Sequence, residues 1–85
     1  MKYLTEEQED SLRAYAAELG NDISATIKEY GINQNEDYFE LLDRVLREPI
    51  GIEDVDEPDV NRLINTLMFE LDDKIQAYWG YLPLV

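Results

Sequence analysis

The chain has 85 residues, with 20 Asp and Glu against 7 Lys and Arg, no His and no Cys, and its formal net charge is -13. This length holds one domain with one core, and the missing Cys and His exclude disulfides, thiolate metal sites and histidine-based acid–base catalysis. Such a charge repels anionic membranes and bare nucleic acid and attracts a basic partner.

The rest of the composition indicates a chain that folds. Hydrophobic residues make up 45% of it and include six Tyr, two Phe and one Trp, which is too rich for a solvated acidic tail. No apolar run approaches the roughly 20 residues that span a bilayer, and residues 6–10 are polar or acidic where a signal peptide would be apolar. We therefore expect one domain, residues 1–85, in the cytoplasm, which is the host cell cytoplasm if the protein is phage-encoded.

A first helix is predicted from Thr5, whose hydroxyl can cap the amides that follow it, while Gln8 occupies the reciprocal capping-box position. Its apolar stripe consists of Leu12, Tyr15, Ala16 and Leu19. A good N-terminal signal and a regular stripe together make this a well-defined element.

The same stripe continues beyond Gly20, through Ile23, Ile27 and Tyr30. One helix through Gly20 costs about 1 kcal/mol relative to Ala, and the alternative is two helices that meet at a kink there. We expect the kink, because Asn21 or Asp22 can cap a second helix and Gly31 can close it.

The third helix is predicted to follow Asn35, which can cap it, with Glu36 and Asp37 in its first turn. Its apolar face consists of Tyr38, Leu41, Leu42, Val45 and Leu46. Pro49 ends it, because proline disfavours helical geometry in the residue before it and lacks an amide donor.

The longest helix is predicted to begin at Pro58, after an acidic linker over residues 49–57, and to end at Gly80. Its apolar positions are Val60, Leu63, Ile64, Leu67, Leu71, Ile75 and Tyr78. The apolar segment 81–85 should pack back onto the helices. The predicted fold class is all-α, a small three- to four-helix bundle with an acidic surface.

Acidic residues on the last two helices and the linker are the candidate partner contacts. They are Glu36, Asp37, Glu40 and Asp43; Glu53, Asp54, Asp56, Glu57 and Asp59; and Glu70, Asp72 and Asp73. In the third helix the spacing places 36, 40 and 43 on one face, about 6 Å apart along the axis. Phosphates follow each other about every 3.4 Å of axis in a DNA strand, so such rows can imitate DNA toward a basic groove.

Simpler explanations account for part of this charge. Acids in the first turn of a helix compensate its dipole, and Glu40 can pair with Arg44 four residues later. These effects leave a chain near neutrality, whereas this one keeps a charge of -13. Adaptation to high salt is a further source of an acidic surface.

Metal binding and catalysis have weaker signals. An EF-hand loop requires glycine after its paired aspartates, and here Pro58 and Asp59 follow Asp54 and Asp56. A nonstandard calcium site built from Glu53, Asp54 and Asp56 is left as an alternative. No phosphate loop or nucleophile motif is present, so we expect no enzyme activity, no cofactor and no metal.

Three aromatic residues, Phe39, Phe69 and Trp79, lie off the main apolar stripes of their helices. A helix that is apolar on more than one side has more than one neighbour. The three therefore predict a second packing surface, against the C-terminal segment, against a second copy in a homodimer, or against the target protein.

Residues 51–70 resemble part of the Ocr-type phage antirestriction proteins, which are small acidic helical mimics of B-form DNA. The likeness lies in an acidic linker with a proline, followed by a helix that begins Asp59-Val60-Asn61-Arg62-Leu63-Ile64 and reaches Glu70, with Trp79 beyond it. Only Asp59 and Glu70 correspond as acidic positions, and the chain lacks the family's densely acidic C-terminal tail. The resemblance implies a dimeric mimic that inhibits a DNA-handling defence enzyme.

Size and acidity are also similar to those of the nuclease-colicin immunity proteins, four-helix domains that cover basic surfaces, although their Asp-Gly-x-Asp-Leu-x-Tyr-Tyr-Pro stretch is absent. The leading hypothesis is a non-enzymatic inhibitor, phage-encoded, that occupies the nucleic-acid groove of a CRISPR effector or restriction enzyme. The alternative is an immunity protein or antitoxin that neutralises one cognate toxin.

Overall fold

The computed structural model describes residues 4–33 and 37–80. Within these residues the chain forms four α-helices: α1 (Glu6–Asn21), α2 (Ile23–Tyr30), α3 (Phe39–Arg47) and α4 (Pro58–Gly80), with the 3-10 turn η1 (Glu48–Ile50) directly after α3. The expected all-α class is therefore confirmed. In the same residues no helix combines the length and apolar character that crossing a membrane requires.

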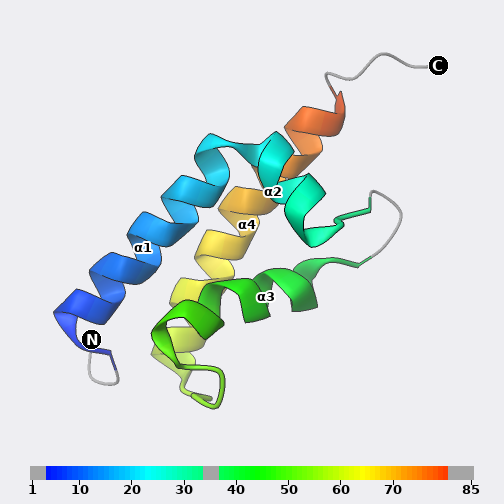
Figure 1. Cartoon of the computed structure of the whole chain (residues 1–85). Coiled ribbons are helices and arrows are strands. Elements are labelled where there is room, and N and C mark those ends of the chain that lie inside the picture. Colours follow the sequence, from blue (N-terminus) through cyan, green and yellow to red (C-terminus); the bar gives the residue numbers. More distant parts are fainter. Residues whose placement is uncertain (1–3, 34–36, 81–85) are drawn as a thin grey trace.

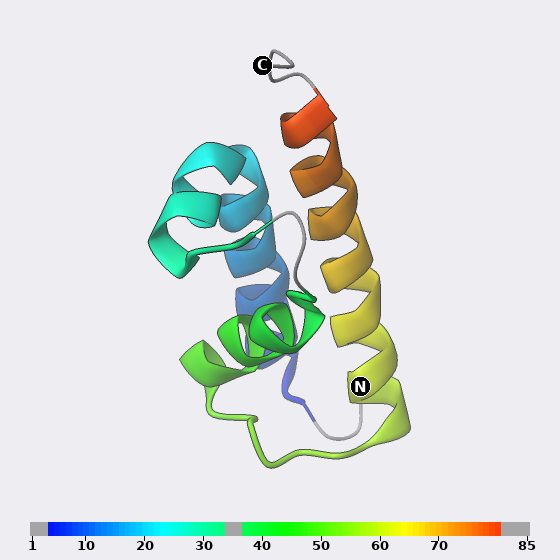
Figure 2. The ribbon, with the colours of Figure 1, turned by 90° about the vertical axis from the view of Figure 1, so that its right-hand side faces the viewer.

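The long helix α4 forms one side of the molecule and contacts each of the other three α-helices. Figures 1 and 2 show α1 and α4 side by side and running in the same direction, with α2 folded back from the end of α1. Helix α3 crosses α4 in Figure 1, and it also contacts α1. The described chain measures 48 × 21 × 18 Å along its principal axes, so it is elongated along α1 and α4.

The core lies where these helices face one another, and its most deeply buried side chains come from α1, α3 and α4. They are Leu12, Leu42, Leu46, Val60, Ile64 and Ile75. All of them belong to the predicted apolar stripes. Burying apolar surface is the main favourable contribution to folding, so these stripes fix which face of each helix turns inward.

The N-terminus of α1 has the predicted capping box. The Gln8 amide donates to Thr5 Oγ1 at 3.0 Å, and the Thr5 amide donates to Gln8 Oε1 at 2.9 Å. Two amide groups that the helix leaves unpaired are thereby satisfied by neighbouring residues.

The predicted break into two helices is confirmed, with Asp22 as the cap of the second, and it lies two residues after Gly20. Gly20 is helical, and its missing side chain leaves room for Lys74 of α4, whose Nζ would lie 2.7 Å from an added Cβ. Asp22 caps α2 by accepting from the Ala25 amide at 3.2 Å. The buried Thr26 hydroxyl donates to the Leu19 carbonyl at 2.9 Å and ties the two helices together.

The end of α2 follows the prediction. Gly31 has a φ of 63°, in the left-handed region that suits glycine, and the Ile32 amide donates to the Ile27 carbonyl at 3.0 Å. The side chain of Ile32 is buried, so the chain turns back toward the core as it leaves the helix.

Helix α3 begins at Phe39, later than predicted. Asp37 precedes the helix, and its carboxylate accepts from the Phe39 amide at 3.0 Å, an interaction that favours a turn over a helical start. Asn35, Glu36 and the segment 81–85 lie outside the described residues. The C-terminal boundary at Pro49 is confirmed, because regular α-helix stops at Arg47 and η1 follows.

Candidate partner-binding surface

An open groove lies between α3, the linker that follows it and the start of α4. We call it the acidic groove and define it by its carboxylates, Asp37, Glu40, Asp43, Glu53, Asp54 and Asp56. It consists of two adjoining hollows of about 550 Å³ each, which share Glu40, Asp43 and Glu53. The structure thus brings Asp37, Glu40 and Asp43 together with most of the predicted linker cluster.

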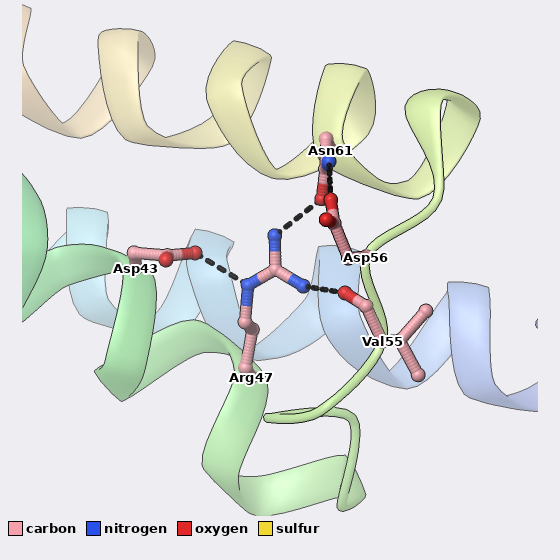
Figure 3. A network of polar contacts seen from close by, with 5 residues as sticks. All are labelled: Asp43, Arg47, Val55, Asp56 and Asn61. Carbon is pink, nitrogen blue, oxygen red and sulfur yellow. Dashed lines mark hydrogen bonds and ion pairs between the residues drawn. The ribbon is translucent and has the colours of Figure 1, made fainter.

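The guanidinium of Arg47 holds the parts of this groove together (Figure 3). Its Nε lies 2.5 Å from Asp43 Oδ1, and its two terminal nitrogens donate at 2.7 Å to the Val55 carbonyl and to Asn61 Oδ1. Asn61 in turn donates to Asp56 Oδ1 at 2.9 Å. One side chain therefore connects α3, the linker and α4.

The Arg47 side chain is largely shielded from solvent, with 11% of it exposed, against 40% for its partner Asp43. A buried guanidinium is tolerated when its donors are paired, and here three of its nitrogens have partners. The sequence signal for this contact is the spacing of four between Asp43 and Arg47. We had assigned that spacing to Glu40 and Arg44, which form no ion pair in the described chain.

The linker reaches the groove through a second anchor. Gly51 has a φ of 68°, and the next residue, Ile52, donates its amide to the Arg47 carbonyl at 3.2 Å and buries its side chain in the core. With Ile52 turned inward, Glu53 and Asp54 are exposed at the groove. The alternation of apolar and acidic residues in the linker therefore sorts its side chains between core and solvent.

Three candidate contacts have structural roles outside the acidic groove. Glu57 caps α4, since its carboxylate accepts from the amides of Asp59 and Val60 at 3.0 and 3.2 Å. Asp59 is exposed and lies 3.9 Å from Arg62. Asp72 accepts a hydrogen bond from the hydroxyl of Tyr38. Glu57 and Asp72 therefore each have a hydrogen-bond partner within the fold.

The other acids of α4 lie elsewhere. Glu70 lines a hollow of about 200 Å³ between α1 and α4, together with the basic residues Arg13 and Lys74. Asp73 is exposed and is not among the groove residues. Glu36 lies outside the described residues. The eleven predicted positions that the structure describes therefore do not form one continuous face.

The aromatic residues that lie off the helical stripes meet in one cluster. The Tyr38 ring stacks on Phe39 at 5.6 Å and meets Trp79 edge-on at 5.9 Å, and Phe39 lies 5.6 Å from Phe69. These centroid distances and tilted geometries are typical of favourable aromatic pairs. The sequence had marked Phe39, Phe69 and Trp79, whereas the central position of Tyr38 was missed because it also belongs to the apolar face of α3.

Two tyrosines have a raised pKa. Burial raises the pKa of Tyr38 to about 12, and the neighbouring carboxylate of Asp72, which accepts its hydrogen bond, acts in the same direction. Its oxygen also accepts from Gln76 Nε2 at 2.8 Å. The pKa of Tyr15 is also about 12, mainly because its hydroxyl is hydrogen-bonded to that of Tyr30 at 3.1 Å.

No group of three acidic side chains in residues 4–33 and 37–80 is placed to hold a metal ion, and this includes Glu53, Asp54 and Asp56. A comparison of the chain with protein-family models found no match. Comparisons with curated proteins and with solved structures found no significant match either.

Proposed function

We propose that this protein is a non-enzymatic inhibitor that binds the nucleic-acid-binding surface of a bacterial defence protein, such as a CRISPR effector or restriction enzyme, by presenting carboxylates where that surface expects phosphates. The setting would be a phage-encoded protein acting in the host cell. The observation that carries the proposal is the acidic groove, in which carboxylates from a helix and a linker lie together on a chain of net charge -13.

Two properties of the groove support a competitive mechanism. Its exposed acids Glu40, Glu53 and Asp54 remain available because the Arg47 contacts use other side chains of the groove. Their backbone is held on connected elements, so a basic partner orders only the side chains on binding. Long-range attraction should speed association and make it sensitive to salt.

The proposal is tested by neutralising acids of the groove and comparing the result with a control variant that loses the same number of negative charges elsewhere. One variant carries Glu40→Gln, Glu53→Gln and Asp54→Asn, and the matched control carries Asp10→Asn, Glu18→Gln and Glu29→Gln, all exposed positions on α1 and α2. The readout is DNA cleavage by purified restriction enzymes and CRISPR effectors. We expect the unmodified protein to inhibit one of them, duplex DNA to relieve the inhibition, and the groove variant to lose at least tenfold more potency than the control.

Equal losses in the two variants would show that total charge, and not the groove, is responsible. Inhibition that excess DNA does not relieve, or that is unchanged between low and high salt, would contradict the mimicry mechanism. Failure to inhibit any nucleic-acid enzyme would contradict the proposed function as a whole.

The aromatic cluster favours a second candidate, an immunity protein or antitoxin that neutralises one cognate toxin. In such complexes a few aromatic anchors carry most of the binding energy. Under this function, Phe69→Ala should weaken binding more than the three groove substitutions together. The reverse order is expected for the DNA mimic.

A further inference from the structure

Two aromatic rings, the exposed Phe69 and the half-buried Phe39, adjoin the acidic groove. Phe69 is 61% exposed and is the one large hydrophobic side chain of residues 4–33 and 37–80 that is exposed to this degree. Its ring packs against Phe39, and Phe39 itself lines the groove together with Glu40, Glu53 and Met68. The apolar pair and the carboxylates therefore form one continuous surface.

This pair is positioned by contacts that leave Phe69 uncovered. Phe39 stacks on Tyr38, which is buried and hydrogen-bonded to Asp72 and Gln76 of α4. The Phe39 ring is thus supported from the core side, and Phe69 lies on it from α4. A supported aromatic ring loses little conformational freedom when a partner packs on it, which is the property of a binding anchor.

Charge decides what kind of molecule can cover this surface. A second copy would bring two chains of charge -13 together at their acidic grooves, and nucleic acid or an anionic membrane would be repelled in the same way. A protein segment that carries both basic and apolar side chains satisfies both halves of the surface. A partner that is basic but has no apolar side chains beside its charges would leave the aromatic rings uncovered. The aromatic rings therefore distinguish the true partner from other basic proteins.

We propose that Phe39 and Phe69 bind an amphipathic basic helix of the partner protein, whose apolar side chains pack on the two rings while its Lys and Arg face the acidic groove. The inference rests on the proposed function and specifies the partner's chemistry at the same site. The aromatic pair supplies the part of the affinity that salt does not screen, and the groove supplies the attraction that salt does screen.

Two synthetic helical peptides of equal length and charge test this inference. Both carry Lys along one face, and the opposite face carries Leu in the first peptide and Gln in the second. Binding to the full-length protein is measured by fluorescence anisotropy of the labelled peptides. We expect the Leu peptide to bind at least tenfold more tightly, Phe69→Ala to abolish this difference, and Phe69→Leu to retain part of it.

The control is Ala14→Ser, an exposed position on α1, which should leave both affinities unchanged. The groove variant Glu40→Gln, Glu53→Gln, Asp54→Asn should weaken both peptides by the same factor. Because Phe69 is exposed, its substitution should leave the fold intact, and circular dichroism checks this.

Several results would overturn the inference. These are equal affinity for the two peptides, no binding of the Leu peptide, or an unchanged preference in Phe69→Ala. A dimer in sedimentation equilibrium that Phe69→Ala dissociates would assign the surface to a second copy. If the variant Leu82→Ser bound the peptide more tightly than the unmodified protein, the segment 81–85 would be the occupant that competes for this surface.

The same data separate this inference from the proposed function. Equal, salt-sensitive binding of both peptides that the groove variant weakens would overturn the aromatic anchor and leave the electrostatic proposal in place. The opposite result is binding of the Leu peptide that Phe69→Ala weakens but that neither salt nor the groove variant affects. It would support the aromatic anchor and overturn the electrostatic proposal.

Discussion

At the scale of single residues, Arg47 connects three parts of the chain, because it pairs with Asp43 of α3, the Val55 carbonyl of the linker and Asn61 of α4 (Figure 3). Its own side chain is 11% exposed, so removing it takes three hydrogen bonds from partly buried groups that solvent replaces only in part.

We therefore expect Arg47→Met to lower the free energy of unfolding by about 2 to 3 kcal/mol, measured by urea denaturation. The matched control is Arg44→Met on the same helix, where the side chain is exposed and the change should stay within about 0.5 kcal/mol. Equal effects of the two substitutions would show that the network contributes nothing specific.

The raised pKa values of Tyr15 and Tyr38 predict a stability change in alkali. A tyrosine whose pKa is about 12 when folded and about 10 when unfolded stabilises the fold at pH values below 10, and this contribution is lost as the pH rises toward 12. Spectrophotometric titration should show tyrosine ionisation that continues well above pH 10, and Tyr38→Phe should reduce this late part. A late part of the titration that is unchanged in Tyr38→Phe would contradict this.

At the scale of elements, the sequence located the helix ends that neighbouring residues define. The capping box at Thr5, the left-handed Gly31 and the start at Pro58 are local signals, and all three are in place. Two boundaries lie later than predicted. Gly20 is helical, and the cap that ends the first helix lies at Asp22. Helix α3 starts late because Asp37 forms a local turn and the Tyr38 hydroxyl bonds to Asp72 of α4.

The junction of α1 and α2 gives a prediction at this scale. Thr26→Val keeps the shape of the buried side chain but removes the hydrogen bond to the Leu19 carbonyl, so the free energy of unfolding should fall by about 1 to 2 kcal/mol. Thr66→Val is the control, because the Thr66 hydroxyl makes a similar bond to a carbonyl within one exposed helix. Chemical denaturation should show a larger loss of unfolding free energy for Thr26→Val than for Thr66→Val. Equal losses in the two variants would refute a special role of the junction.

At the scale of the whole molecule, the net charge of -13 acts on a narrow body with cross-sections of 21 and 18 Å. Electrostatic screening extends over about 30 Å at 0.01 M salt and about 10 Å at 0.1 M, so repulsion crosses the molecule at low salt and is largely screened at higher salt. The strength of the repulsion between the acidic side chains of the fold therefore depends on the salt concentration.

We expect added NaCl to raise the melting temperature, most steeply between about 0.01 and 0.1 M. The triple variant Asp10→Asn, Glu18→Gln, Glu29→Gln should show a shallower dependence, because it carries less charge with the same core. Thermal unfolding followed by circular dichroism measures both. A melting temperature that falls with NaCl would contradict self-repulsion as the governing effect.

The sequence by itself determined the properties that arise from composition or from residues within about one helical turn: the net charge, the all-α class, the apolar stripes and most helix caps. Only the tertiary structure decided which acidic residues lie together and which form contacts within the fold. It gathered Glu40, Glu53 and Asp54 at one groove, paired Asp72 with Tyr38, and placed Phe69 beside Phe39. The physical reason is that these relations join residues far apart in the chain, and they exist only after the core has fixed how α3 and the linker lie against α4.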